Sequence, residues 1–123
     1  MCRIIYFELY ADDPERARAF YRKTLGWSFE EVEEVGGAGE IWRITTGDSP
    51  GLGGFLMRRG NPRATIWNVV DVPSIDEAVR QVLENGGKEV TPKFAIPGVE
   101  FLAYCQDSEG NVFGLREANP RAA

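Results

Sequence analysis

The pattern of hydrophobic and polar positions divides the chain into two stretches that contain the same elements in the same order. In the first stretch, residues 3–10 are rich in β-branched and aromatic side chains, which predicts a strand. Asp13 followed by Pro14 predicts the start of a helix, and Gly26 predicts its end. Three more strands are expected at about 27–35, 40–46 and 52–59, with glycine-rich turns at 36–39 and 47–51.

A short hinge at residues 60–63 precedes the second stretch, in which the order repeats. A strand is expected at 64–71. Ser74 and Glu77 have the spacing of a capping box, in which Ser74 caps the following helix and Glu77 reaches back to its start. Glycines at 86–87 predict the end of this helix. The remaining strands are expected at about 88–95, 100–106 and 111–117.

The two stretches also share residues, since Ala17 and Gly26 recur as Ala78 and Gly87 after a shift of 61 positions. One such unit cannot bury both faces of its sheet, whereas two units can curl their sheets around a shared space with the helices outside. We therefore predict one α+β domain over residues 1–123, made of two βαβββ modules at about 3–59 and 64–118. Their curled mixed sheet would enclose an internal cavity.

Composition narrows the chemistry, because the 123 residues include no histidine. This excludes Ser-His-Asp and Cys-His mechanisms and histidine-zinc sites. The formal charge of −5 argues against a nucleic-acid partner, and no apolar run reaches the length of a membrane span. Cys2 and Cys105 form no disulfide framework, and we expect Cys105 to be a buried, inert thiol. We expect a cytoplasmic protein.

Alternation along the first strand places Tyr6, Glu8 and Tyr10 on one face, and Trp67 of the fifth strand is related to Tyr6 by the same shift of 61. The rings could form an aromatic-walled pocket for a flat or apolar small molecule, or they could fill the core. Glu8 among these rings would lose hydration and become a stronger base, suited to acid-base chemistry or to binding a cationic group. Alternatively, Glu8 lies at the open end of the strand, in solvent or paired with an arginine.

Further candidates lie on other predicted strands. Trp42 and Arg43 are neighbours, so only one of them faces inward on a regular strand. Arg43 or Arg116 could pair with Glu8 or bind a substrate carboxylate, although an exposed strand arginine is the simpler interpretation. Phe101 is an aromatic strand residue that we predict to contact the ligand.

The sequence resembles the vicinal oxygen chelate superfamily, the group of glyoxalases, bleomycin resistance proteins and extradiol dioxygenases. The resemblance runs from Ile5 to Glu117 and looks closest to the small glyoxalase-like subgroup. It implies a fold of paired βαβββ modules. The residues that carry it are Asp13-Pro14-Glu15-Arg16-Ala17, Phe20-Tyr21, Leu25-Gly26-Trp27 and the closing run from Asp107 to Leu115.

Metalloenzymes of this family hold a divalent metal inside the sheet, with ligands that are typically His, Gln or Glu. The resemblance implies that the four ligand positions fall at Tyr6, Trp67, Gly53 or Gly54, and Gly114. An indole has no available lone pair, glycine has no side chain, and a phenol is a poor lone ligand. We therefore predict neither a metal nor another cofactor.

Two functions follow from these observations. The first is a metal-independent, glyoxalase-like protein that binds a small, partly apolar molecule in an aromatic-lined cavity. The second is an acid-base isomerase or lyase that uses Glu8 on a small carbonyl substrate, so whether the protein is an enzyme stays open. A metal regained through Glu8, Glu40 or Glu100 is a third possibility, without nitrogen ligands.

We expect a homodimer, because modules of this family often pair across sheet edges. The predicted ligand contacts are Tyr6, Glu8, Trp42, Arg43, Trp67 and Phe101.

Overall fold

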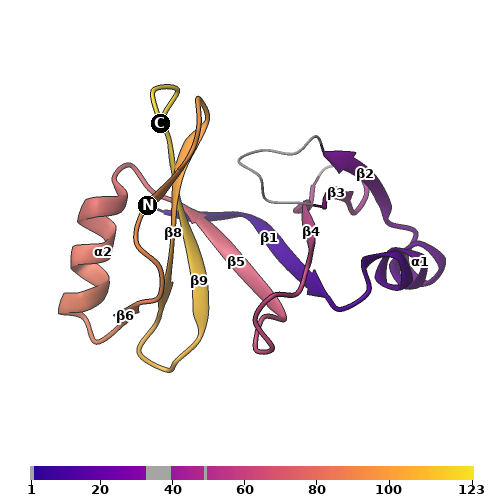
Figure 1. Ribbon diagram of the computed structural model, residues 1–123, viewed down its shortest axis with the longest axis horizontal. Coiled ribbons are helices and arrows are strands. Elements are labelled where there is room, and N and C mark those ends of the chain that lie inside the picture. The colour runs from indigo at the N-terminus through magenta and orange to yellow at the C-terminus, as the bar shows by residue number, and fades with distance from the viewer. Residues whose placement is uncertain (1, 33–39, 49) are drawn as a thin grey trace. The chain divides into compact units, whose positions relative to one another are not determined.

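The computed structural model describes residues 2–32, 40–48 and 50–123, so the turn predicted at 36–39 lies outside the described residues. Figure 1 shows the elements along the chain. The helices and strands are β1 (Arg3–Ala11), α1 (Pro14–Leu25), β2 (Ser28–Val32), β3 (Ile41–Thr45), β4 (Gly54–Arg58), β5 (Ile66–Asp71), α2 (Ile75–Glu84), β6 (Lys88–Glu89), β7 (Phe94–Ile96), β8 (Glu100–Gln106) and β9 (Val112–Ala118).

The chain forms two compact units, and each repeats the same pairing of strands. The N-terminal unit comprises Tyr6–Trp67, and the C-terminal unit comprises Asn68–Ala123 with Met1–Ile5. In the N-terminal unit the strand order is β2-β3-β4-β1, with β1 parallel to β4 and the other pairs antiparallel. In the C-terminal unit the order is β5-β9-β8-β6, with β5 parallel to β9. The α+β fold with two βαβββ modules is confirmed.

Each unit has its own hydrophobic core between its helix and one face of its sheet. In the N-terminal unit, alternate residues of β1 enter the core with Ala17 of α1 and with residues of β3 and β4. In the C-terminal unit, Ile75 of α2 packs against β8 and β9. The buried core residues are Phe7, Ala11, Trp42, Ile44 and Leu56 in the first cluster, and Val72, Ile75, Ala103, Cys105 and Leu115 in the second.

Helix α1 begins and ends as its sequence predicts. The Asp13 carboxylate accepts a hydrogen bond from the backbone N–H of Arg16 at 3.1 Å, which satisfies one free donor of the first turn. Gly26 ends the helix in the left-handed conformation, with φ of 73°, and its N–H donates to the carbonyl of Arg22 at 3.1 Å. In the described part of the chain, neither helix is long and apolar enough to cross a membrane.

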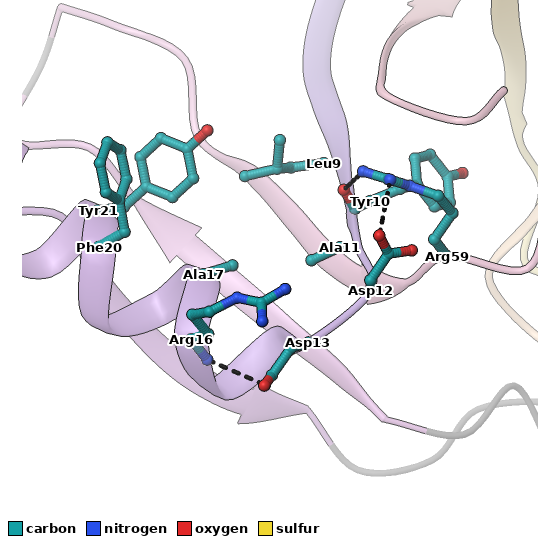
Figure 2. A pocket seen from close by; sticks show the side chains of 10 residues that line it. All are labelled: Leu9, Tyr10, Ala11, Asp12, Asp13, Arg16, Ala17, Phe20, Tyr21 and Arg59. Carbon is teal, nitrogen blue, oxygen red and sulfur yellow. Dashed lines mark hydrogen bonds and ion pairs between the residues drawn. The ribbon is translucent and has the colours of Figure 1, made fainter. Parts of the chain in front are cut away.

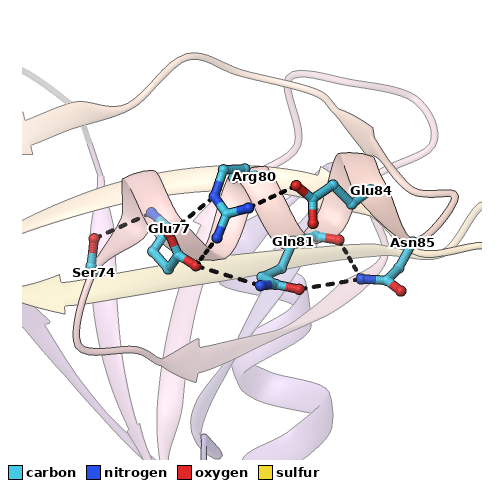
Figure 3. A network of polar contacts seen from close by, with 6 residues as sticks. All are labelled: Ser74, Glu77, Arg80, Gln81, Glu84 and Asn85. Atoms are coloured by element: carbon cyan, nitrogen blue, oxygen red, sulfur yellow. Dashed lines mark hydrogen bonds and ion pairs between the residues drawn. The ribbon is translucent and has the colours of Figure 1, made fainter.

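Helix α2 differs from the predicted capping box in one respect. Ser74 caps it as expected, because its hydroxyl accepts from the N–H of Glu77 at 3.2 Å. The Glu77 carboxylate does not reach back but accepts hydrogen bonds from Arg80 and Gln81, and Arg80 also donates to Glu84 at 2.7 Å (Figure 3). An arginine one turn along the helix is a stronger donor than a backbone amide, which explains the difference.

The first N–H of α2 has a partner that the sequence pattern does not reveal. Ile75 donates to Oε1 of Glu117 at 2.9 Å, and Glu117 lies on β9. A carboxylate at a helix N-terminus is favourable both as an acceptor and as a negative charge. The last strand therefore fixes the start of the second helix.

The single strand predicted at 88–95 is wrong, because β6 and β7 are two short strands that pair with different parts of β8. Between them, the N–H groups of Val90 and Thr91 both donate to the carbonyl of Tyr104, at 2.8 and 3.1 Å. The Thr91 hydroxyl accepts from the N–H of Tyr104 at 3.0 Å. Val90 and Thr91 thus lie opposite the single residue Tyr104, as in a β-bulge. Pro92 follows them and has no N–H with which to continue the strand pairing.

The parallel pairing of β1 with β4 depends on close approach at Gly54. Gly54 lies opposite Phe7, and a Cβ at position 54 would lie 2.3 Å from the Phe7 carbonyl oxygen and 2.8 Å from its ring. A backbone oxygen inside a ladder cannot move aside as a flexible side chain can. Only glycine therefore allows this strand pair in its present register.

We predict that Gly54→Ala lowers the free energy of unfolding by about 3 kcal/mol, because the methyl group forces β1 and β4 apart. The matched control is Gly60→Ala, where an added Cβ meets no atom within 4 Å. It should change stability by less than about 1 kcal/mol. Urea unfolding of both variants checks this expectation, and similar midpoints for the two would contradict it.

Candidate functional site

The face of the N-terminal sheet that points away from α1 carries a group of aromatic residues around one carboxylate. We call it the aromatic face, and it consists of Tyr6, Glu8, Tyr10, Phe55 and Trp67. Because β1 alternates, its even-numbered residues leave the α1 core and lie together here. The Tyr6 and Phe55 rings meet edge to face at 5.2 Å, and the Tyr10 and Trp67 rings lie 4.9 Å apart.

Glu8 lies on β1 between Tyr6 and Tyr10, which each belong to one of these ring pairs, and it is 5% exposed. No other polar or charged residue of the described chain is classed as buried. The Tyr10 hydroxyl donates a hydrogen bond to Oε1 of Glu8 at 3.0 Å. A buried carboxyl group is costly unless it has hydrogen-bond partners, so this contact helps to hold the Glu8 side chain in its buried position. The structure thus places Glu8 among the rings and out of solvent.

Arg43 lies on the same side of the sheet as the aromatic face, at its margin. Its guanidinium lies 5.8 Å from the centre of the Phe55 ring, and Nη1 is 3.9 Å from Oε1 of Glu30. The ion pair of Arg43 is therefore with Glu30. The side chain is 53% exposed, which leaves its donors accessible.

Trp42 has the opposite orientation and is not part of the aromatic face. It belongs to the buried core beside α1, and the Arg18 guanidinium lies 4.5 Å above its ring. Alternation explains the placement, since Arg43 occupies the other side of β3. Of these two predicted ligand contacts, Trp42 is therefore the one that lies in the core and Arg43 the one on the side of the aromatic face.

Phe101 is likewise on the helix side of its sheet. It packs against the core formed by Ala103 and Cys105 beside α2, and the Lys93 ammonium lies 4.8 Å from the centre of its ring. Tyr104 takes the opposite face of β8 and lies against Gly114. The small residues Ala103 and Cys105, which leave room for a helix, are the signal that could have assigned Phe101 to the core.

The buried position of Cys105 is confirmed, and desolvation raises the pKa of its thiol.

The residues at the implied metal positions do not fit a metal. Gly53 alternates with Gly54 and so lies on the side of Phe55, where a Cβ would be 2.8 Å from the carbonyl oxygen of Ile44. At Gly114 a Cβ would be 3.1 Å from both the Tyr104 ring and Val69. At Gly53 a backbone oxygen thus occupies the space that a ligand side chain would need, and at Gly114 two side chains crowd that space. Across the described residues, no three Cys, Asp or Glu side chains gather as a metal site would require.

A second polar cluster, in the C-terminal unit, was not predicted as a unit. Arg116 lies 3.4 Å from Asp71 through Nη1 and 3.5 Å from Oε1 of Glu100 through Nε. The Glu100 side chain is 13% exposed. Its desolvation raises the pKa of this carboxyl, while the positive charge and the donors of Arg116 oppose the rise. Arg116, considered above as a partner of Glu8, therefore has two carboxylate partners on neighbouring strands.

The N-terminal unit also contains a pocket of about 360 Å³ on the α1 side of its sheet. It lies between the end of β1 and the first turns of α1 (Figure 2). No sequence motif marks it, because it arises only when the helix packs against the strand. Its lining residues are Leu9, Tyr10, Ala11, Asp12, Asp13, Arg16, Ala17, Phe20, Tyr21 and Arg59.

Comparison with known protein families gives a match over most of the chain. The sequence model of the Glyoxalase/Bleomycin resistance protein/Dioxygenase superfamily matches residues 3–115. The "Putative glyoxylase CFP32" of Mycobacterium bovis is 27% identical over 118 residues, which are 93% of this chain and 45% of that protein. The chain thus spans about half the length of this relative. A glyoxylase-like domain-containing protein of Didymella fabae is 26% identical, with 88% of each chain covered.

Solved structures show the same fold. The hypothetical protein BH1468 of Bacillus halodurans aligns with a TM-score of 0.69 at 16% identity, covering 99% of this chain and 98% of that one. The methylmalonyl-CoA epimerase of Mycobacterium tuberculosis aligns with a TM-score of 0.66 at 17% identity, covering 95% and 88%. At these identities the structures support the fold, and with the family match they confirm the resemblance inferred from the sequence.

The Glu100 cluster generates a prediction about pH. The carboxyl has a raised pKa in the folded state, so the folded protein holds its proton at pH values where the unfolded chain has released it. This contribution to stability is present below the usual value of 4.5 and is lost as the pH rises through the folded pKa. We therefore compare the unfolding free energies of the wild type and of Glu100→Gln. The wild-type value minus the variant value should fall as the pH rises through this range. A difference that rises with pH would contradict the sign, and unfolding curves from pH 4 to 8 decide it.

The contact between Tyr10 and Glu8 generates a second prediction. Tyr10→Phe keeps the ring against Trp67 but removes a donor to a buried carboxylate, so we expect a loss of about 2 kcal/mol in unfolding free energy. Tyr21→Phe is the matched control, since the Tyr21 ring stacks on Trp27 while its hydroxyl has no hydrogen-bond partner among the described residues. Thermal and urea unfolding would show a large effect for the first variant only. Equal stability of both would mean that the hydroxyl contributes nothing to holding Glu8.

Proposed function

Because the chain belongs to the Glyoxalase/Bleomycin resistance protein/Dioxygenase superfamily, we propose that it binds a small, partly apolar molecule against the aromatic face without a metal. The observation that carries this proposal is the buried Glu8 carboxylate among aromatic rings, on the sheet face where the family resemblance puts a metal. A metal at this position would attract oxygen ligands that carry negative charge. A Glu8 carboxylate would instead attract hydrogen-bond donors and positive charge. The proposed ligand therefore has the opposite charge to a metal-binding ligand.

The side chains of the aromatic face define the ligand class. The rings of Tyr6, Phe55 and Trp67 offer flat apolar surface, which favours an aromatic or aliphatic body. Glu8 can accept hydrogen bonds and attract a positive charge, and cations are further stabilised over aromatic rings. We therefore propose a ligand with an apolar body and an amino or other donor group. Arg43 at the margin is available for a more polar end of the molecule.

A second function is favoured by the hydrogen bond between Tyr10 and Glu8. A carboxylate held in an apolar setting can remove a proton from the carbon beside a carbonyl group and return it, which is isomerase or lyase chemistry. Tyr10 would position Glu8 for this step. Proteins with the same fold include methylmalonyl-CoA epimerases, which shows that the fold accommodates isomerases. We rank this function second because Glu8 is a single carboxylate among the residues of the aromatic face, and proton transfer of this kind usually needs a matched partner.

The proposal includes a homodimer. In the order of the N-terminal sheet, β2 is a terminal strand, and a terminal strand offers unpaired backbone groups to a second copy. Leu25 and Ile66 are more than half exposed in the single chain, which leaves apolar surface to be covered. Light scattering on the purified protein would give twice the mass of one chain, whereas a single-chain mass at all concentrations would refute this element of the proposal.

The role of Glu8 is tested with phenethylamine as a probe, because it joins an apolar ring to a protonated amine. We expect Glu8→Gln to weaken its binding by roughly tenfold or more, the loss typical of a charge-assisted contact. Tryptophan fluorescence reports the binding through Trp67, and Glu31→Gln on β2, an exposed carboxylate, is the control that should leave it unchanged. Circular dichroism confirms that both variants are folded.

A parallel measurement separates the two functions. Deuterium exchange from heavy water into the carbon beside the carbonyl of a simple thioester would be catalysed by the wild type only if the second function holds. Loss of that exchange in Glu8→Gln would then establish proton transfer. Unchanged phenethylamine affinity in Glu8→Gln, together with no exchange in the wild type, would contradict both functions.

A further inference from the structure

The pocket beside α1 has a chemistry of its own, different from that of the aromatic face. Its floor is formed by Leu9 and Ala11 of β1 and by Ala17 of α1, all apolar. Leu9 and Ala11 belong to the α1 side of the sheet, whereas Glu8 and Tyr6 lie on the other side. The volume of about 360 Å³ lies within the range of roughly 300–1,000 Å³ found for small-molecule sites.

The acidic residues at the rim are already engaged. The Asp12 carboxylate lies 3.2 Å from Nη1 of Arg59, and Nη2 of Arg59 donates to the carbonyl of Tyr10 at 3.0 Å. The Asp13 carboxylate accepts from the N–H of Arg16 as the cap of α1. The ion pair with Arg59 compensates the charge of Asp12 and fixes Arg59 in place, whereas the cap gives the Asp13 carboxylate a backbone hydrogen-bond donor (Figure 2).

Arg16 is the second cationic side chain of the pocket, beside Arg59. Its side chain is exposed, and its guanidinium forms no ion pair with any residue in the described ranges. Figure 2 shows the guanidinium on the side of α1 that borders the pocket. A guanidinium binds a carboxylate through two parallel hydrogen bonds, which gives both affinity and orientation.

The opposite wall of the pocket is aromatic. The Phe20 and Tyr21 rings meet edge to face at 5.1 Å, and Tyr21 is fixed by stacking on Trp27 at 4.8 Å. Phe20 is 57% exposed, so more than half of its side-chain surface remains in water. An aromatic ring held over this wall would cover surface that is otherwise left in water.

From these contacts we propose that the pocket is a second binding site, specific for a small aryl carboxylate. The carboxylate binds the Arg16 guanidinium, and the ring lies on the apolar floor against Phe20. The site does not depend on the function proposed for the aromatic face. We expect the two sites to select ligands of opposite charge, because one presents a guanidinium that has no ion-pair partner among the described residues and the other contains a buried carboxylate.

The probe is 2-naphthoate, with the neutral 2-naphthamide as its matched comparator. Amide signals of Ala17 and Phe20 in a nitrogen-15 spectrum of the full chain should shift during titration with naphthoate and much less with the amide. Arg16→Gln should weaken naphthoate binding roughly tenfold, the loss expected for a charge-assisted pair. Arg22→Gln, which changes another exposed arginine of α1 outside the pocket, should leave binding unchanged.

Three results would overturn the proposal. Equal naphthoate affinity in Arg16→Gln and the wild type would remove the role of the guanidinium. Shifts confined to Trp67 and its neighbours would place the probe on the aromatic face. Signals of Phe20 that change with protein concentration alone would show that a second copy covers the pocket. Glu8→Gln should bind naphthoate as the wild type does, so failure here and failure of the proposed function are distinguishable.

Discussion

The close approach of neighbouring strands at glycine residues is the constraint on which both units depend. In the N-terminal unit, Gly54 lets β4 pair with β1 in parallel, and Gly53 lies just before it, against the carbonyl of Ile44. In the C-terminal unit, Gly114 on β9 lies opposite Val69 on β5 and is covered by the Tyr104 ring. The same strands in metalloenzymes of the family are expected to present ligand side chains. In this chain the corresponding positions on β4 and β9 are glycines that pack closely against neighbouring atoms.

The glycines leave the chemistry of the aromatic face to its other residues, because glycine has no side chain. The polar group buried on this face is the Glu8 carboxylate, which accepts a hydrogen bond from Tyr10. A buried carboxylate favours donors and cations, whereas a bound metal would favour oxygen anions. We therefore propose for this face a ligand whose charge is opposite to that attracted by a metal. Membership of the superfamily establishes the architecture, and the residues on the sheet determine what it can bind.

Local signals in the sequence were sufficient for much of the fold. The Asp13 cap, the Gly26 stop and the repeat of elements predict α1 and the order of the strands, because these depend on backbone conformation within a few residues. The alternation of β1 also groups Tyr6, Glu8 and Tyr10 correctly. By contrast, the side of the sheet taken by Trp42 and by Phe101 depends on where each helix packs, which lies outside the strands themselves. Similarly, the contact of Glu117 with Ile75 spans distant parts of the chain, and no local pattern encodes it.

The most direct test of the central claim is a metal titration of the purified protein. The chain is treated with a chelator, titrated separately with Zn²⁺, Ni²⁺, Co²⁺ and Mn²⁺ in a calorimeter, and then analysed for bound metal after gel filtration. Since the implied ligand positions are tyrosine, tryptophan and glycine, we predict no stoichiometric binding of any of the four ions. One tightly bound divalent ion per chain, lost in Glu8→Gln, would show that Glu8 is a metal ligand and would contradict the account.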